Sequence, residues 1–156
     1  VRPVRREFVP LYHHNLFRKF KERVRTEVDH EMLMRVVPEG TVLRDVYTEL
    51  AEGHLTLGRQ VGTYGLLVGV PYDVPLDRFV DVKVTGHGQR SLTAVEYPFD
   101  VNHAPMRAIA SLPGIGAKRA ARIVRARPFQ SMTDFAAALD EVRVAERLAP
   151  FVGLGG

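Results

Sequence analysis

The stretch from Leu112 to Val124 reads LPGIGAKRAARIV and places two glycines directly before a basic, alanine-rich segment. Glycine adopts backbone conformations with φ > 0 and allows a ligand to approach the main chain closely. The segment after Gly116 is expected to be a helix, whose first turn presents free N–H groups and the positive end of the helix dipole. Such a turn favours an anion, and Lys118, Arg119 and Arg122 add positive charge beside it.

The sequence on both sides extends this pattern. A preceding helix is expected to begin at Val101–Asn102, with Asn102 as its N-cap and an apolar side within residues 106–110. Downstream, residues 127–135 read RPFQSMTDF. Together these features resemble the helix-hairpin-helix motif, and residues 127–135 resemble the P-F-x-S-x-x-D-F/L stretch of the competence DNA-receptor type of this domain.

The resemblance implies an all-α domain over residues 98–156 with two hairpins, the second within residues 139–152. Val142-Arg143-Val144 stands where the second hairpin would have its Gly-x-Gly, so only the first hairpin is expected to bind phosphate. The expected phosphate-binding residues are Gly114, Ile115, Gly116, Lys118, Arg119 and Arg122. The plainer alternative is an ordinary αα-hairpin turn with a basic face toward solvent.

The charge distribution agrees with a polyanionic partner. The chain has 22 basic and 18 acidic residues, and residues 98–128 hold six of the basic ones against one acid. Residues 41–97, in contrast, carry five basic and seven acidic residues. Clustered positive charge is the expected footprint of a nucleic-acid binder, and it lies around the first hairpin.

Residues 41–97 are rich in β-branched residues and interrupted by glycine and proline. Val80, Val82 and Val84 alternate with polar residues, which is typical of a half-buried strand. Five strands are expected, over residues 41–50, 55–61, 65–70, 79–85 and 91–96. Five strands in so short a segment cover their edges by closing into a small barrel.

This segment is similar to the TRAM domain, a small OB-like β-barrel that holds RNA in radical-SAM RNA-modifying enzymes. Residues 79–85 and 91–95 match its closing hairpin, and Gly58-Arg59 and Gly69-Val70-Pro71 match its Gly-Arg and inner strand. Arg59 is then a candidate contact to nucleic acid. Tyr64, in an expected barrel loop, is a second one because aromatic rings stack on bases in OB-like folds. The alternatives are a barrel without a ligand and a Tyr64 that only anchors its loop.

The N-terminal part is expected to be an extended arm followed by a helix over residues 15–37, which Pro38-Glu39-Gly40 would end. Apolar residues recur there at spacings of three and four: Phe17, Phe20, Val24 and Val28. The expected fold is therefore α+β. It has an arm and helix (residues 1–40), a five-stranded OB/TRAM-like barrel (residues 41–97) and an all-α (HhH)2-type domain (residues 98–156).

This order of parts resembles the C-terminal region of archaeal radical-SAM proteins that end in a helix-hairpin-helix motif. The catalytic core of that family carries a Cys-x-x-x-Cys-x-x-Cys motif, and this chain has no cysteine. The resemblance implies a fragment without catalytic residues, whose parent enzyme carries the 4Fe-4S cluster and S-adenosylmethionine on a missing N-terminal core. Its implied function is to grip the sugar-phosphate backbone of RNA (tRNA included) or DNA without sequence specificity.

The sequence gives less support to other classes of function. The alternative to nucleic-acid binding is a protein-interaction or assembly module. His13, His14 and His30 lack the spacing of a helical metal site, so no metal is expected. The sequence has neither an apolar run of about 20 residues nor a secretory h-region. We therefore expect no membrane partner and a cytoplasmic location.

Overall fold

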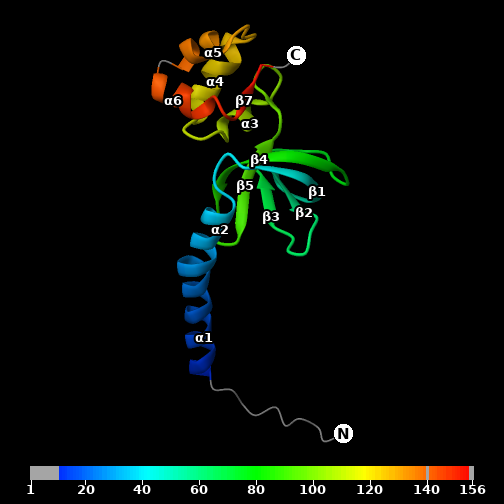
Figure 1. Cartoon of the computed structure of the whole chain (residues 1–156), viewed down its shortest axis with the longest axis vertical. Coiled ribbons are helices and arrows are strands. Elements are labelled where there is room, and N and C mark those ends of the chain that lie inside the picture. Colours follow the sequence, from blue (N-terminus) through cyan, green and yellow to red (C-terminus); the bar gives the residue numbers. More distant parts are fainter. Residues whose placement is uncertain (1–10, 140, 155–156) are drawn as a thin grey trace, which may run out of the picture.

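The computed structural model describes residues 11–139 and 141–154. It has three consecutive parts: a helical rod, a β-barrel and a group of short helices (Figure 1). The α+β architecture, with its N-terminal helix, five-stranded barrel and following helices, is confirmed at this level. The extended arm falls almost entirely on residues 1–10, outside the described residues.

The rod consists of α1 (Leu11–Val24), one π-helical segment (Arg25–Asp29) and α2 (His30–Val36). The expected helix is confirmed and begins a few residues earlier. It ends as expected before Pro38, and Gly40 turns the chain toward the barrel with φ +88°. The apolar stripe, however, is not buried, since Phe17, Phe20 and Val28 are all more than half exposed. The reason is that α1 projects away from the barrel (Figure 1).

The barrel contains β1 (Val42–Glu52), β2 (Leu55–Gln60), β3 (Leu67–Val70), β4 (Phe79–His87) and β5 (Ser91–Glu96). The five expected strands are confirmed. They close in the order β1-β2-β3-β5-β4, with β4 pairing back onto β1. Within the barrel, only the β3–β5 pair is parallel. This five-stranded closed barrel fits an OB-like fold.

Small and β-branched side chains fill the barrel interior. Val68, Val82, Val84 and Ala94 are fully buried there. Gly58 allows the close approach of β1, because a Cβ at this position would lie 2.6 Å from the Tyr47 carbonyl oxygen. The interior is thus packed with protein, and ligands can reach only the outer surface and the ends of the barrel.

The C-terminal part holds α3 (Met106–Ala110), α4 (Ala117–Ala126), α5 (Met132–Leu139) and α6 (Val142–Leu148). Two short strands, β6 (Phe99–Asp100) and β7 (Val152–Gly153), pair in parallel and bring its two ends together. The core of this part is apolar, with fully buried side chains at Ile109, Ile123, Phe135 and Leu148. The helices form two successive hairpins, α3–α4 and α5–α6.

The expected N-cap at Asn102 is wrong. Helix α3 begins only at Met106, and Pro105 is its N-cap. The Asn102 side-chain amide instead donates to the carbonyl oxygens of Phe129 (3.1 Å) and Leu154 (2.7 Å) and accepts from the Phe129 N–H (2.8 Å). These partners occupy both donors and the acceptor of the amide, so Asn102 links three segments of the helical part.

The barrel and the helical part are joined by charged and aromatic side chains. The Lys83 ammonium on β4 lies 5.1 Å from the ring centroid of Tyr97 and 5.6 Å from that of Phe151. Arg147 on α6 forms an ion pair with Glu39, at 3.5 Å, just before β1. The helical part is therefore seated on the barrel, and the rod extends from the opposite side (Figure 1).

Candidate nucleic-acid interface

The first hairpin is built around the turn between α3 and α4, residues 111–116. Leu112 and Ile115 anchor this turn in the core, being 2% and 5% exposed. The Ile115 N–H donates to the Leu112 carbonyl oxygen at 3.0 Å, so this amide is used within the turn. Gly114 between them is exposed and has φ +80°, a left-handed conformation that favours glycine.

Gly116 has a different reason to be glycine. It is the N-cap of α4, with φ −101° and ψ 176°, which any residue adopts. A Cβ built on it meets no atom within 4 Å. Neither backbone strain nor packing requires glycine here, and open space lies in front of the first turn of α4. The N–H groups of Ala117 and Lys118 have no carbonyl partner within their own helix, because they belong to its first turn.

The structure brings the predicted cations together on α4 but gives them different roles. Lys118 and Arg122 are both exposed and lie four residues apart, so they occupy one face of the helix. Arg119 donates to the Gly114 carbonyl oxygen at 2.9 Å and pairs with the Glu141 carboxylate. Arg119 therefore braces the turn, and part of its charge is already balanced.

The second hairpin differs from the first at the corresponding point. Glu141 is the N-cap of α6 and directs its carboxylate to Arg119 on the first hairpin. A carboxylate at this position repels phosphate, whereas the first hairpin has an uncharged glycine. The two hairpins therefore differ in charge at the N-cap of their second helix. Val142-Arg143-Val144, expected at the turn of the second hairpin, instead form the first turn of α6.

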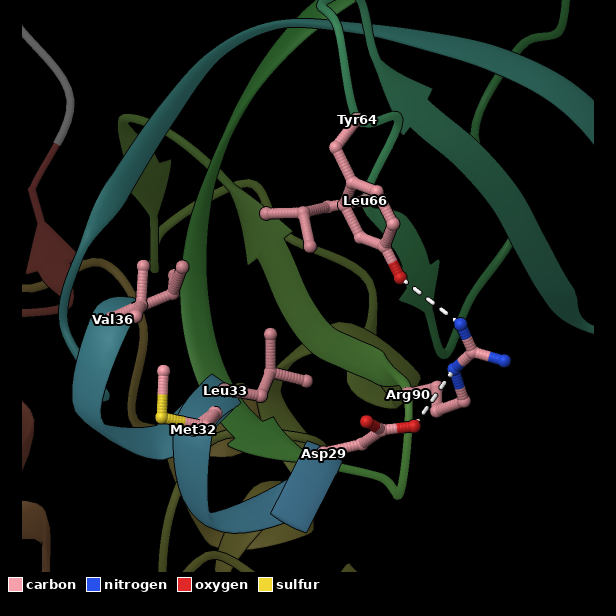
Figure 2. Close-up of a pocket in the computed structure, with 8 residues that line it drawn as sticks. Asp29, Met32, Leu33, Val36, Tyr64, Leu66 and Arg90 are labelled. Carbon is pink, nitrogen blue, oxygen red and sulfur yellow. Dashed lines mark hydrogen bonds and ion pairs between the residues drawn. The ribbon is translucent and has the colours of Figure 1, made fainter. Parts of the chain in front are cut away.

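Arg59 and Tyr64 lie on the barrel, away from the hairpin turn. Arg59 on β2 pairs with Glu49 at 3.1 Å. Tyr64 in the β2–β3 loop is 68% exposed, and its hydroxyl accepts a hydrogen bond from Arg90 at 3.2 Å (Figure 2). Tyr64 is thus not a core residue. Sequence reasoning missed Arg90, although it lies in the β4–β5 loop, one of the oligonucleotide-binding loops of OB-folds.

The chain itself offers no ligands for an iron–sulfur cluster, because it contains no cysteine. Among residues 11–139 and 141–154, no group of three or more histidine and acidic side chains is placed to hold a metal ion. Within the same residues, no helix combines the length and the apolar character needed to cross a bilayer.

The chain is similar to proteins of two archaea. The chain is 52% identical over 80 residues to an uncharacterized protein of Methanocaldococcus jannaschii, covering 50% of the chain and 15% of that protein. It is 39% identical over 102 residues to an uncharacterized protein of Archaeoglobus fulgidus, covering 65% of the chain and 19% of that protein. The aligned region is thus less than a fifth of either relative's length. No protein-family model and no solved structure matches the chain.

Proposed function

We propose that this chain is the nucleic-acid-binding module of a larger radical-SAM iron–sulfur enzyme, and that its first hairpin is a helix-hairpin-helix phosphate site. The observation that carries the proposal is the open space at Gly116, in front of the first turn of α4. Lys118, in the first turn of α4, and Arg122, one turn further along, lie on one exposed face of this helix. The fold does not require glycine at this position. A ligand that occupies the space in front of α4 explains why no side chain is present there.

In this proposal one phosphate binds to the first N–H groups of α4, where the helix dipole adds a favourable field. The Lys118 ammonium neutralises that phosphate or the next, and Arg122 reaches a neighbour one turn further. Arg119 holds the turn in shape through Gly114. Contacts of this kind reach only the backbone of the nucleic acid, so binding is independent of base sequence.

The parent enzyme is proposed from the resemblance and is supported by the lengths of the relatives. Those proteins extend far beyond the region that matches this chain. In the proposal, the 4Fe-4S cluster and S-adenosylmethionine belong to a part of the enzyme outside this chain. The hairpin and the TRAM-like barrel then present RNA to that part for modification, with DNA as the second candidate substrate.

Fluorescence anisotropy with tRNA, single-stranded RNA and duplex DNA at low salt tests the proposal. Lys118→Glu should weaken binding to each nucleic acid by a similar factor and reduce the salt slope by about 1. Arg18→Glu is the matched control, because it makes the same charge change on exposed α1, away from the hairpin. Equal affinities for the Lys118→Glu variant and the wild type would refute the phosphate site.

A second function, protein assembly, is favoured by a separate observation. Leu16, Phe17 and Phe20 on α1 are 60%, 57% and 62% exposed and form an apolar stripe. Apolar surface of this kind is normally covered by another protein surface. An assembly module without nucleic-acid binding predicts no complex with any of the three nucleic acids at low salt, which separates it from the first proposal.

A further inference from the structure

A groove of about 380 Å³ lies between α2 and the β2–β3 loop, on the barrel (Figure 2). Its apolar wall comes from Met32, Leu33 and Val36 on α2 and from Leu66 beside β3. The ring of Tyr64 stands at its opening and is largely exposed. The groove therefore offers a flat aromatic surface next to an apolar wall, which is the environment that a planar heterocycle prefers.

One edge of this groove is polar. The Arg90 guanidinium donates to the Tyr64 hydroxyl at 3.2 Å, and its Nε lies 3.2 Å from a carboxylate oxygen of Asp29 (Figure 2). The guanidinium is a donor and the carboxylate an acceptor, and both sit on the same side of the groove. A nucleobase has the complementary arrangement, because its faces are apolar and its edge carries donors and acceptors together.

Positive charge borders the groove. Two further grooves adjoin it and share Arg90, and Arg25 lines both of them. Lys21 lines one of these as well. The linings of the three grooves contain three cations, from Lys21, Arg25 and Arg90, against one carboxylate, from Asp29. This charge suits the phosphates on either side of a base, whereas an apolar protein side chain gains nothing from it.

We propose that this groove binds one unpaired nucleobase, stacked on Tyr64 with its edge toward Asp29 and Arg90. The flanking phosphates lie along Lys21 and Arg25. The inference rests on the proposed function and adds to it: the nucleic acid held by this chain is single-stranded where it crosses the barrel. Aromatic stacking accepts any base, so the stacking contact itself selects for single-stranded nucleic acid.

The test compares a single-stranded oligonucleotide with an abasic strand of the same length and charge, using the 156-residue chain. The wild type should prefer the strand with bases. Tyr64→Ala should weaken binding to that strand about 5- to 150-fold, the range for loss of one stacked base, and leave binding to the abasic strand unaffected. Tyr64→Phe is the control, because it keeps the ring and loses only the hydroxyl. The exposure of Tyr64 makes both variants compatible with folding.

The inference would be overturned if the wild type bound the two strands with equal affinity. It would also be overturned if Tyr64→Ala bound the strand with bases as tightly as the wild type does. An apolar segment of a partner protein would then be the occupant to consider. Lys118→Glu separates this failure from failure of the hairpin site. If Lys118→Glu lowers the affinity for both strands while Tyr64→Ala changes the affinity for neither, the hairpin proposal is supported and the base-groove proposal is refuted. If Lys118→Glu has no effect while Tyr64→Ala weakens only the strand with bases, the groove binds a base and the hairpin proposal falls.

Discussion

Replacing each glycine of the α3–α4 turn by alanine should have unequal effects on stability. Gly114 has φ +80°, and an L-residue in the left-handed region costs about 1–2 kcal/mol. Gly116 has φ −101°, and a Cβ there meets nothing within 4 Å. Alanine at such a compatible position stabilises by about 0.4–1 kcal/mol, because it restricts the unfolded chain. Gly116 is also the N-cap of α4, where alanine is less favourable than glycine by a similar amount, so the two effects offset each other. Gly114→Ala should therefore be the more destabilising substitution, by about 1–2 kcal/mol.

Thermal unfolding followed by circular dichroism measures this difference. For a chain of this size, 1 kcal/mol corresponds to a shift in Tm of about 2–4 °C. Gly114→Ala should lower Tm by about 2–8 °C, and Gly116→Ala should leave it nearly unchanged. A loss of several degrees with Gly116→Ala as well would contradict this expectation, because it would show that the fold does not accommodate a Cβ at Gly116.

Three further predictions concern other residues of the fold and the site. Asn102→Ala should lower the free energy of unfolding by about 2–3 kcal/mol in urea titrations, because it leaves the Phe129 backbone groups without their side-chain partner; a loss below about 0.5 kcal/mol would contradict its linking role. Glu141→Gln should release Arg119, strengthen RNA binding several-fold and steepen the salt slope by about 0.7, with little change in stability; weaker binding in anisotropy would contradict this. Burial raises the pKa of Tyr72 above its ordinary value of 10.0, so the folded state holds the phenol proton more tightly than the unfolded state does. The free energy of unfolding should therefore be maintained below about pH 10 and fall above it. Denaturation measured as a function of pH should show a smaller fall for Tyr72→Phe than for the wild type.

Much of the fold follows from local sequence patterns. The alternation around Val82 and the glycine and proline breaks located the five strands, because a half-buried strand repeats every two residues. The 3–4 spacing of Phe17 and Phe20 located the N-terminal helix, and the structure leaves both side chains exposed. Periodicity indicates which residues share a face but does not show whether another surface covers that face.

The misjudged features all depend on partners distant in sequence. Asn102 reads as a helix cap because asparagine is common there, yet its partners are 27 and 52 residues further along the chain. Arg119 reads as a free cation, and Glu141, 22 residues away, pairs with it. In the sequence, Arg25 belongs to the expected N-terminal helix and Arg90 to the acidic barrel segment, and no pattern connects the two. Only the fold shows that both line the same groove.

The salt dependence of RNA affinity shows whether the hairpin holds phosphates. Two or three phosphates neutralised by Lys118, Arg122 and a partly released Arg119 predict a slope of log affinity against log salt of about −1.4 to −2.1, or steeper if the barrel contributes. Gly116→Val combined with Lys118→Glu should remain folded, bind far more weakly and have a slope shallower by about 1. A salt-independent affinity, or a double variant that binds like the wild type, would rule out the phosphate site.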